Sequence, residues 1–300
     1  MHCFEKILVV HNGALGDFIN VWPALLGLHR HWPGTPLYWA GRMQYRLWTD
    51  PLMPLASAAD RKAVSALYAA RSWPGELHKT LVVWFGLHRI PFALEHPQLW
   101  TFCGLNSADW TPPREQYLNG LAAKGIPRPA DWQEAWRQGP PAALLENYDS
   151  TKKAAGACGR TTCWPLERFL NVARWVAQQG GDPVFLLGPA EVERGYKVQN
   201  FKHISPPDLA SLQAAIVGAR LILGNDAGPM HLAGAWGRPA ISIFGPSARQ
   251  QWAPVTATAL ASSRSCRPCT RDGRIDCHSP HCLEDISCEM VTSQLHSYLP

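Results

Sequence analysis

The 300-residue sequence has no run of 18 apolar residues, the length that a membrane-spanning helix requires. Its first ten residues, MHCFEKILVV, also lack the apolar centre and the small-residue cleavage site of a secretory signal peptide. We therefore expect a cytoplasmic protein, whose nine cysteines are mostly free thiols rather than a disulfide framework.

Charge is scarce as well: charged residues make up 17% of the chain, and the net charge is only +5. This small and dispersed excess of positive charge argues against nucleic acid as a partner. It is compatible with an anionic substrate or a membrane surface. The apolar content of 46% suffices for a folded core, and the length suits two domains of about 150 residues each.

Short apolar runs alternate with amphipathic segments in both halves of the chain. In the first half, the pattern predicts strands at 6–13, 36–41 and 81–86 and a helix at 17–31. In the second half, it predicts helices at 164–181, 190–200, 207–219 and 229–237, and strands at 183–188, 201–205, 220–225 and 240–245.

This alternation is typical of doubly wound α/β domains with parallel sheets. We expect two such domains, residues 1–150 and 151–300, that face each other across a cleft at the carboxyl ends of their strands. Residues 90–150 have little periodicity and many Pro, Trp and Gly, so we expect acceptor-side loops and the domain link there.

The segment NGALGDF, residues 12–18, joins the first predicted strand to the first helix. Gly13 and Gly16 loosen the turn, and Asp17 begins the helix. Asp is a preferred N-cap residue, which gives it a sufficient structural reason. A carboxylate on a rigid element at a cleft edge is also what a general base needs to take a proton from a hydroxyl.

The segment GNDAGPMHLAGA, residues 224–235, places Asp226 after an apolar strand and Pro229 at the first helical position. The backbone N–H groups of residues 227–231 would then lie unpaired at the positive end of a helix, which suits a phosphate group. Gly228 lets a ligand approach the backbone, and His231 is placed to donate to a phosphate oxygen. A capped helix with a core histidine explains the same residues structurally.

A third segment, LLGPAEVER, places Glu191 at a helix start, where it can accept hydrogen bonds from two ribose hydroxyls. Favourable electrostatics at a helix N-terminus explain the residue too, and for this segment alone that is the better explanation.

Together, NGALGDFINVWPAL, WPLERF, LLGPAE and GNDAGPMHLAGAWGRPAISIFGPS, in this order, resemble the ADP-heptose:lipopolysaccharide heptosyltransferases, family 9 of the glycosyltransferases. The resemblance implies a GT-B fold, with two Rossmann-like domains that bind the acceptor on the N-terminal side and the nucleotide-sugar donor on the C-terminal side. It implies transfer with inversion and without a metal or other cofactor. The sugar, a heptose carried by ADP, would pass to a lipid-linked, lipopolysaccharide-type glycan at the cytoplasmic face of the inner membrane.

The same resemblance implies roles for single residues. Asp17 would be the base that deprotonates the acceptor hydroxyl, with Gly13 and Gly16 on the acceptor side. The residues implied for the nucleoside, the sugar and the diphosphate are Glu191, Asp226, Gly228 and His231. The helix N-terminus would stabilise the charge of the departing diphosphate.

The sequence departs from the family at the phosphate contacts. Thr162 stands where relatives carry a Lys two residues before the Trp of the WP pair, and Ala227 stands where Thr or Ser is common. Arg160 can supply the missing charge, although Arg and Lys differ in reach and geometry. A lost charge-assisted contact weakens binding by about 1.5–3 kcal/mol. A second hypothesis is therefore a weakened or inactive relative that binds a nucleotide or glycan as a sensor or assembly partner.

Five cysteines crowd near the C-terminus, at positions 266, 269, 277, 282 and 288. Cys266 and Cys269 have the CxxC spacing of a zinc site, but only seven residues separate Cys269 from Cys277, fewer than in a usual zinc ribbon. We expect reduced or partly bridged thiols here; structural zinc or an iron–sulfur site held by Cys266, Cys269, Cys277 and Cys282 is the alternative.

Overall fold

The computed structural model describes residues 4–106, 109–138, 153–157, 163–198, 200–271, 274–275, 277 and 280–298. The chain divides into two compact units, residues 1–140 and 141–300. The predicted domain boundary, between residues 150 and 151, lies outside the described residues. Among the described helices, none is long and apolar enough to cross a membrane.

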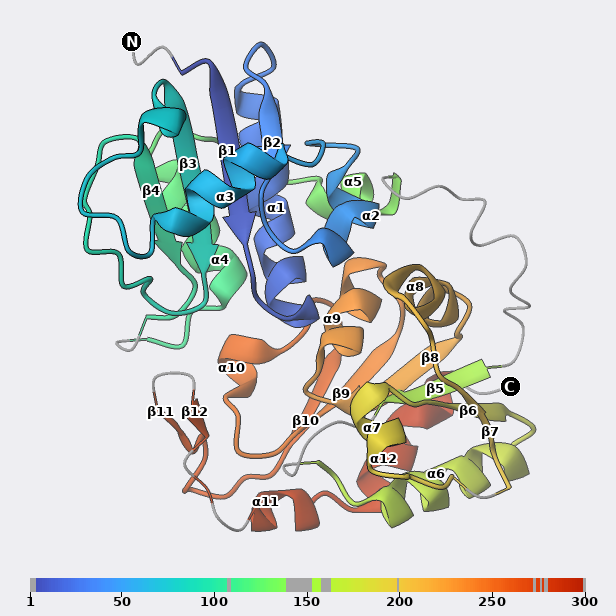
Figure 1. Cartoon of the computed structure of the whole chain (residues 1–300). Coiled ribbons are helices and arrows are strands. Elements are labelled where there is room, and N and C mark those ends of the chain that lie inside the picture. Colours follow the sequence, from blue (N-terminus) through green and yellow to red (C-terminus); the bar gives the residue numbers. More distant parts are fainter. Residues whose placement is uncertain are drawn as a thin grey trace. The chain divides into compact units, whose positions relative to one another are not determined.

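The first unit is built on a parallel sheet whose strand order is β2-β1-β3-β4 (Figure 1). Its strands are β1 (Lys6–His11), β2 (Leu37–Trp39), β3 (Thr80–Gly86) and β4 (Leu99–Cys103). From β1 the chain passes to β2 on one side of β1, and it then crosses to β3 on the other side. The switch point of this sheet therefore lies between β1 and β3. Ligands of open α/β sheets bind at the carboxyl ends of the strands at such a point.

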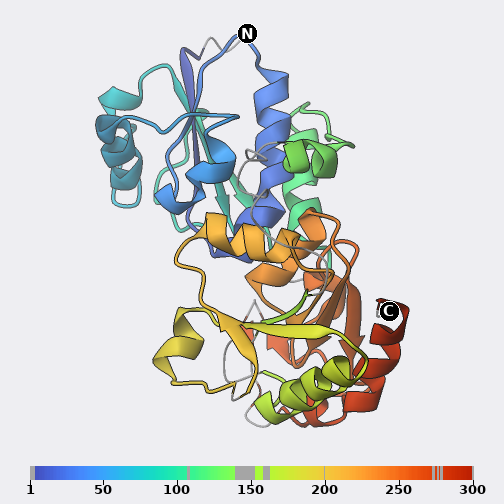
Figure 2. The ribbon, with the colours of Figure 1, turned by 90° about the vertical axis from the view of Figure 1, so that its right-hand side faces the viewer.

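Helices cover both faces of this sheet. Helix α3 (Ala58–Ala66) packs on one face, where its Val64 contacts a core that includes Leu8 and Val82. Helix α1 (Leu15–His31) and α4 (Pro113–Ala122) pack together on the other face (Figure 2). The remaining helical segments of the unit are η1 (Met43–Tyr45), α2 (Arg46–Thr49), η2 (Gly75–Leu77) and α5 (Trp132–Gln138).

The second unit has a six-stranded parallel sheet in the order β10-β9-β8-β5-β6-β7. Its strands are β5 (Lys153–Ala157), β6 (Asp182–Leu186), β7 (Lys202–Ile204), β8 (Leu221–Asn225), β9 (Ala240–Phe244) and β10 (Thr258–Ala261). Its switch point lies between β5 and β8, at the end of the strand that the GNDAGP segment follows.

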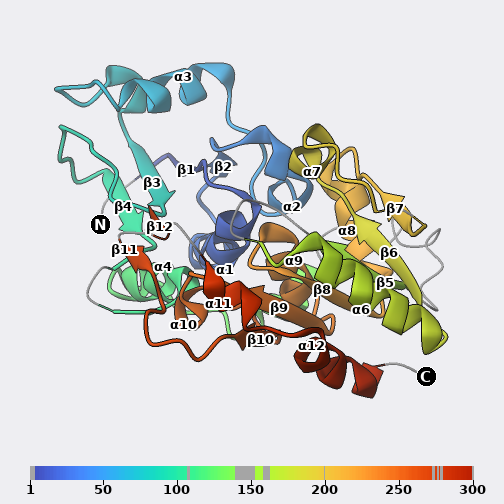
Figure 3. The ribbon, with the colours of Figure 1, turned by 90° about the horizontal axis from the view of Figure 1, so that it is seen from below.

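Helices α6 (Leu166–Gln178) and α12 (Cys288–Leu295) lie side by side on one face of the second sheet (Figures 1 and 3). Their Phe169 and Val291 share a core with Leu223 and Ile243 of the strands. Helices α8 (Leu209–Val217) and α9 (Gly228–Ala235) pack together on the other face. The remaining elements are α7 (Pro189–Glu193), α10 (Arg249–Trp252), the ribbon β11 (Thr270–Arg271) with β12 (Arg274–Ile275), α11 (His281–Glu284) and η4 (His296–Tyr298).

The predicted doubly wound α/β architecture is confirmed in both units, but two sequence predictions were wrong. Residues 90–150 were expected to be loops, yet they include β4, α4 and α5. Their pattern is weak because β4 is an edge strand in which Phe102 is the one buried side chain. The helix predicted at 190–200 ends at Glu193, because Gly195 adopts φ +65°, the left-handed conformation that terminates helices.

Candidate active site

The turn between β8 and α9 is fixed from two sides. The side-chain oxygen of buried Asn225 accepts a hydrogen bond from the Trp164 backbone N–H at 2.9 Å. The Asp226 backbone N–H donates to the Ile243 carbonyl at 3.1 Å, and its carboxylate accepts from the Ser247 hydroxyl at 2.8 Å. Asp226 is thus held at the carboxyl end of β8 by the neighbouring strand β9 and the loop that follows it.

Helix α9 begins without a side-chain cap. Its N-cap is Ala227, in an extended conformation, and Pro229 lies in the first turn. The prediction that the N–H groups of 227–231 are all unpaired was wrong: Pro229 has none, and the Met230 N–H donates to the Ala227 carbonyl at 3.0 Å. The N–H groups of Ala227 and Gly228 have no hydrogen-bond partner among the described residues. These two donors remain for an anion at the helix start.

Glu191 lies in the first turn of α7, which follows β6, and its side chain is 4% exposed. Its Oε2 atom accepts from the Gly188 N–H at 2.9 Å, which caps the helix. Its Oε1 atom is buried and accepts no hydrogen bond from the described residues. A buried carboxylate oxygen without a donor is costly, so this atom calls for a partner that the described residues do not supply.

Glu191 and the start of α9 both lie at the carboxyl ends of the strands of the second sheet. Strands β6 and β8 are separated by β5 alone, which puts their ends roughly 10 Å apart. A nucleoside diphosphate fits these two places. Its ribose hydroxyls can donate to the Glu191 Oε1 atom, and its negatively charged diphosphate can accept from the N–H groups at the start of α9. His231 lies in the next turn of α9 and is buried, with 7% of its surface exposed.

In the first unit, Asp17 is the third residue of α1 rather than its N-cap, which is Ala14. The predicted N-cap role was therefore wrong, but the Asp17 Oδ2 atom accepts from the Ala14 N–H at 3.0 Å and so stabilises the helix start from the third position. The turn packs closely: a side chain at Gly13 would come within 2.8 Å of both the His11 ring and Asp17 Cβ. Gly16 contributes its carbonyl, which accepts from the Asn20 side chain at 3.0 Å.

Asp17 acts electrostatically on two tyrosines that sequence reasoning missed. The Tyr45 hydroxyl donates to the Gly13 carbonyl at 2.9 Å, and the Tyr117 hydroxyl donates to the Gly86 carbonyl at 3.1 Å. Burial raises the pKa of both phenols, and the negative charge of Asp17 raises them further. They come from segments 28 and 100 residues after Asp17, so no local motif could have found them.

His11, at the end of β1, is a buried neutral imidazole beside the same turn. Its Nδ1–H donates to the Phe85 carbonyl at 3.0 Å, which leaves Nε2 buried and unprotonated, without a partner among the described residues. Burial lowers the pKa of His11 from 6.5 to about 4, against the raising effect of the Phe85 bond.

We therefore expect acid to destabilise the fold through His11. The unfolded chain takes up the proton near pH 6.5 and the native chain only near pH 4, so this stabilisation is complete above pH 6.5 and is lost as the pH falls. Between pH 7 and pH 5 the loss is about 2 kcal/mol. His11→Asn keeps a donor for Phe85 but does not titrate. Urea unfolding at both pH values should show that much less pH dependence in the variant; equal pH dependence would contradict the assignment.

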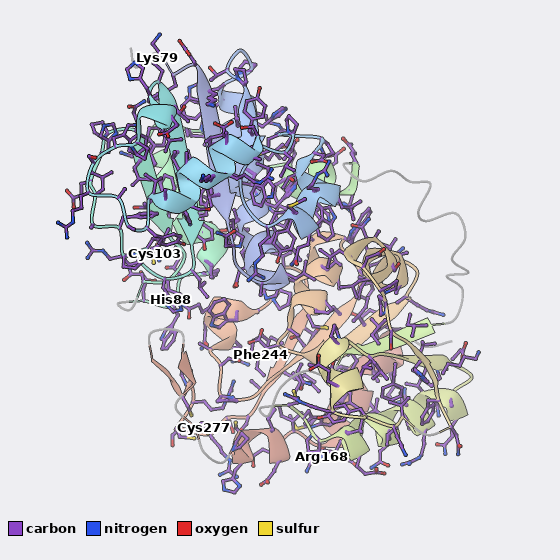
Figure 4. The ribbon with its side chains drawn as sticks, in the orientation of Figure 1. Lys79, His88, Cys103, Arg168, Phe244 and Cys277 are labelled. Atoms are coloured by element: carbon purple, nitrogen blue, oxygen red, sulfur yellow. The ribbon has the colours of Figure 1, made fainter. Side chains whose placement is uncertain are left out.

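Cys266 and Cys269 precede the β11–β12 ribbon in the sequence, and Cys277, which Figure 4 labels, and Cys282 follow it. All seven cysteines in the described ranges are thiols. Burial, with contributions from the thiols of Cys277 and Cys266, raises the pKa of Cys269 to about 11. Among the described residues, no three His, Cys, Asp or Glu side chains are arranged as metal ligands, and the absence of a metal stays a prediction.

Comparison with known proteins identifies the family. The model of glycosyltransferase family 9 (heptosyltransferase) matches residues 130–281, just over half of the chain. The chain belongs to glycosyltransferase family 9.

Two curated heptosyltransferases match parts of this family 9 chain. Lipooligosaccharide heptosyltransferase 2 of Campylobacter jejuni is 27% identical over 155 residues, 47% of this chain and 48% of that protein. Lipopolysaccharide heptosyltransferase 3 of Escherichia coli is 30% identical over 103 residues, 31% of this chain and 30% of that protein. The chain thus spans half or less of the length of the curated relatives it matches.

Solved structures match along nearly the whole chain. A family 9 glycosyltransferase from Veillonella parvula has a TM-score of 0.71 at 20% identity, with 98% of this chain and 97% of that one covered. The E. coli heptosyltransferase WaaC with ADP has a TM-score of 0.66 at 15% identity, with 98% and 99% covered. At these identities the likeness concerns the fold, and it confirms the predicted GT-B class.

Two predicted donor residues of this family 9 chain, Arg160 and Thr162, lie outside the described residues. The strand that precedes them in the sequence, β5, borders the switch point of the second sheet. The structure places Asp226, Ala227 and Gly228 in one turn and His231 one turn further along α9, with Glu191 at the carboxyl end of the same sheet.

Proposed function

We propose that this chain is an inverting glycosyltransferase that moves a heptose from ADP-heptose to a lipopolysaccharide-type glycan. The observation that carries the donor assignment is that two features lie together at the carboxyl end of the second sheet. One is the Glu191 Oε1 atom, which has no partner among the described residues, and the other is the start of α9, which has no side-chain cap. The names of the curated relatives, a lipooligosaccharide and a lipopolysaccharide heptosyltransferase, support the sugar and the acceptor.

In this proposal, Glu191 accepts hydrogen bonds from the ribose hydroxyls. The Ala227 and Gly228 N–H groups and His231 bind the diphosphate, while Asp226 orients the sugar. The acceptor oxygen attacks the anomeric carbon as its proton passes to Asp17, and the bond from that carbon to the diphosphate breaks. Attack from the face opposite the leaving group inverts the anomeric centre. The positive end of α9 stabilises the charge that develops on ADP.

We further propose that no metal takes part. A helix N-terminus and Arg160 would supply the positive charge that a divalent cation supplies in other transferases. The lipid-linked acceptor places the enzyme at the cytoplasmic face of the inner membrane, in peripheral contact.

A second candidate function follows from the donor turn itself. Ala227 has no hydroxyl to cap α9 or to reach a phosphate, and the family lysine is replaced by Thr162. A protein with these two losses can retain nucleotide binding while it transfers sugar slowly, and it would then act as a sensor or an assembly partner.

One experiment tests both candidates. The full chain is incubated with ADP-heptose, GDP-sugars or UDP-sugars and a lipopolysaccharide acceptor in the presence of EDTA, and ADP release and product mass are followed. Binding of each nucleotide is measured in parallel by thermal shift, where ligand at 100 times its Kd stabilises by about 2.7 kcal/mol. Transfer from ADP-heptose in EDTA supports the proposal, binding without transfer supports the second candidate, and no response to any nucleotide contradicts both.

A further inference from the structure

A polar cavity of about 140 Å³ lies in the second unit, between the loops that follow β9 and β10. Its lining contains three arginines, three serines and a glutamine, and no acidic side chain. One lining residue is Ser247, whose hydroxyl donates to Asp226 at 2.8 Å. The cavity therefore adjoins the proposed donor site, but the proposed mechanism gives its arginines no role.

The three arginines of the lining, Arg249, Arg264 and Arg267, differ in how their charge is balanced. Arg264 forms a two-fold ion pair with Asp285, with N···O distances of 2.6 and 2.7 Å, and is neutralised. Arg267 donates only to backbone carbonyls, those of residues 245, 262 and 247, at 2.5, 2.9 and 3.1 Å. The guanidinium group of Arg249 has neither an ion pair nor a hydrogen bond among the described residues.

Two positive charges without a carboxylate partner thus line one small cavity. Arg267 is rigid, because its three carbonyl contacts tie together the two loops that form the walls, and two of its five N–H donors remain. Arg249 is exposed and able to turn toward a ligand. Guanidinium groups bind the oxygens of phosphate groups through paired donors, and they do so best where the geometry is fixed in advance.

The cysteine loop supports this arrangement. Cys266 and Cys269 flank Arg267 in the sequence, and the Cys269 N–H donates to the Pro246 carbonyl at 2.9 Å in the loop after β9. The Cys269 thiol in turn contacts the Cys266 carbonyl at 3.1 Å. These two bonds of Cys269 tie the segment that carries Arg264 and Arg267 to the loop after β9.

We propose that this cavity binds a phosphate group of a substrate, with Arg249 and Arg267 as its ligands. A volume of about 140 Å³ is large enough for the five heavy atoms of a phosphate ion. The inference deepens the proposed function and rests on it for the identity of the substrate. The phosphate belongs either to the diphosphate of the donor or to a phosphorylated acceptor.

The test is calorimetric titration of the full chain, at fixed ionic strength, with inorganic phosphate and separately with ADP. Arg249→Gln should bind phosphate about ten-fold more weakly or worse, because it loses a charge-assisted contact. Arg220→Gln removes an equally exposed arginine at the other end of β8 and should bind phosphate like the unmodified chain. If Arg249→Gln also weakens ADP ten-fold, the phosphate is that of the donor; if ADP binding is retained, it is that of the acceptor.

Equal phosphate affinity in Arg249→Gln and the unmodified chain would overturn the proposal, as would the absence of phosphate binding. Because Arg249 is exposed, the variant should fold, and its circular dichroism and unfolding midpoint confirm this before titration. An unmodified chain that binds phosphate through Arg249, but binds no ADP and transfers no heptose, would refute the proposed function while the phosphate site stands.

Discussion

Replacing Asp17 by Asn should lower the turnover of heptose transfer by roughly 10²- to 10⁴-fold, the usual contribution of a general base. Asn has the shape of Asp and keeps an oxygen that can accept from the Ala14 N–H, so the start of α1 is retained. It has no basic oxygen at neutral pH, so the acceptor hydroxyl loses the group that takes its proton. ADP affinity should change by less than about two-fold, since the proposed nucleotide contacts all lie in the second unit.

The matched control is Asp50→Asn, an Asp in the same unit that is exposed and pairs with Arg46 at 2.8 Å. An exposed pair of this kind contributes at most about 1 kcal/mol to stability, so this variant should keep full turnover. Turnover at saturating donor and acceptor, together with ADP titration of both variants, gives the comparison. If Asp17→Asn lowers the unfolding free energy and leaves turnover intact, Asp17 serves only to hold the helix start.

Strong local signals made much of the fold predictable from the sequence. Strands β1, β3, β8 and β9 are continuous apolar runs, because each is central in its sheet and is buried on both faces. Strand β4 escaped prediction because an edge position buries only Phe102, and α4 escaped because only four of its ten residues are buried, at positions 113, 117, 118 and 121. The local sequence pattern thus predicts elements that are fully buried and misses elements that are only partly covered by their neighbours.

The donor turn could be predicted because a strand end, a Gly and a Pro specify it locally. The surroundings of Asp17 could not be predicted, because the fold of the unit, and no local motif, brings Tyr45 and Tyr117 near it. Ser247 is an intermediate case: it lies in the IFGPS segment that marks the family, but its bond to Asp226 appears only in three dimensions. Residues that are close in the sequence, within one turn, could be predicted as site residues. Residues that are distant in the sequence and meet only in the folded unit could not.

Glu191→Gln should weaken ADP binding by roughly 10- to 100-fold, the loss expected when two ribose hydroxyls no longer meet a charged acceptor. The substitution leaves the helix cap in place, because the Gln oxygen can accept from the Gly188 N–H as Oε2 does. It also removes a buried charge, whose second oxygen has no partner among the described residues. The free energy of unfolding without nucleotide should therefore stay the same or rise.

This pair of measurements separates the two interpretations of Glu191 that the sequence left open. If the residue served only to cap α7, the substitution would leave ADP affinity unchanged and any effect would fall on stability. If it binds the ribose, affinity falls while stability holds. Glu193→Gln is the control, because Glu193 ends the same helix, is exposed and should change neither quantity. A drop in affinity shared by both variants would point to the net charge of the segment rather than to the buried Oε1 atom, and would remove the observation on which the donor assignment depends.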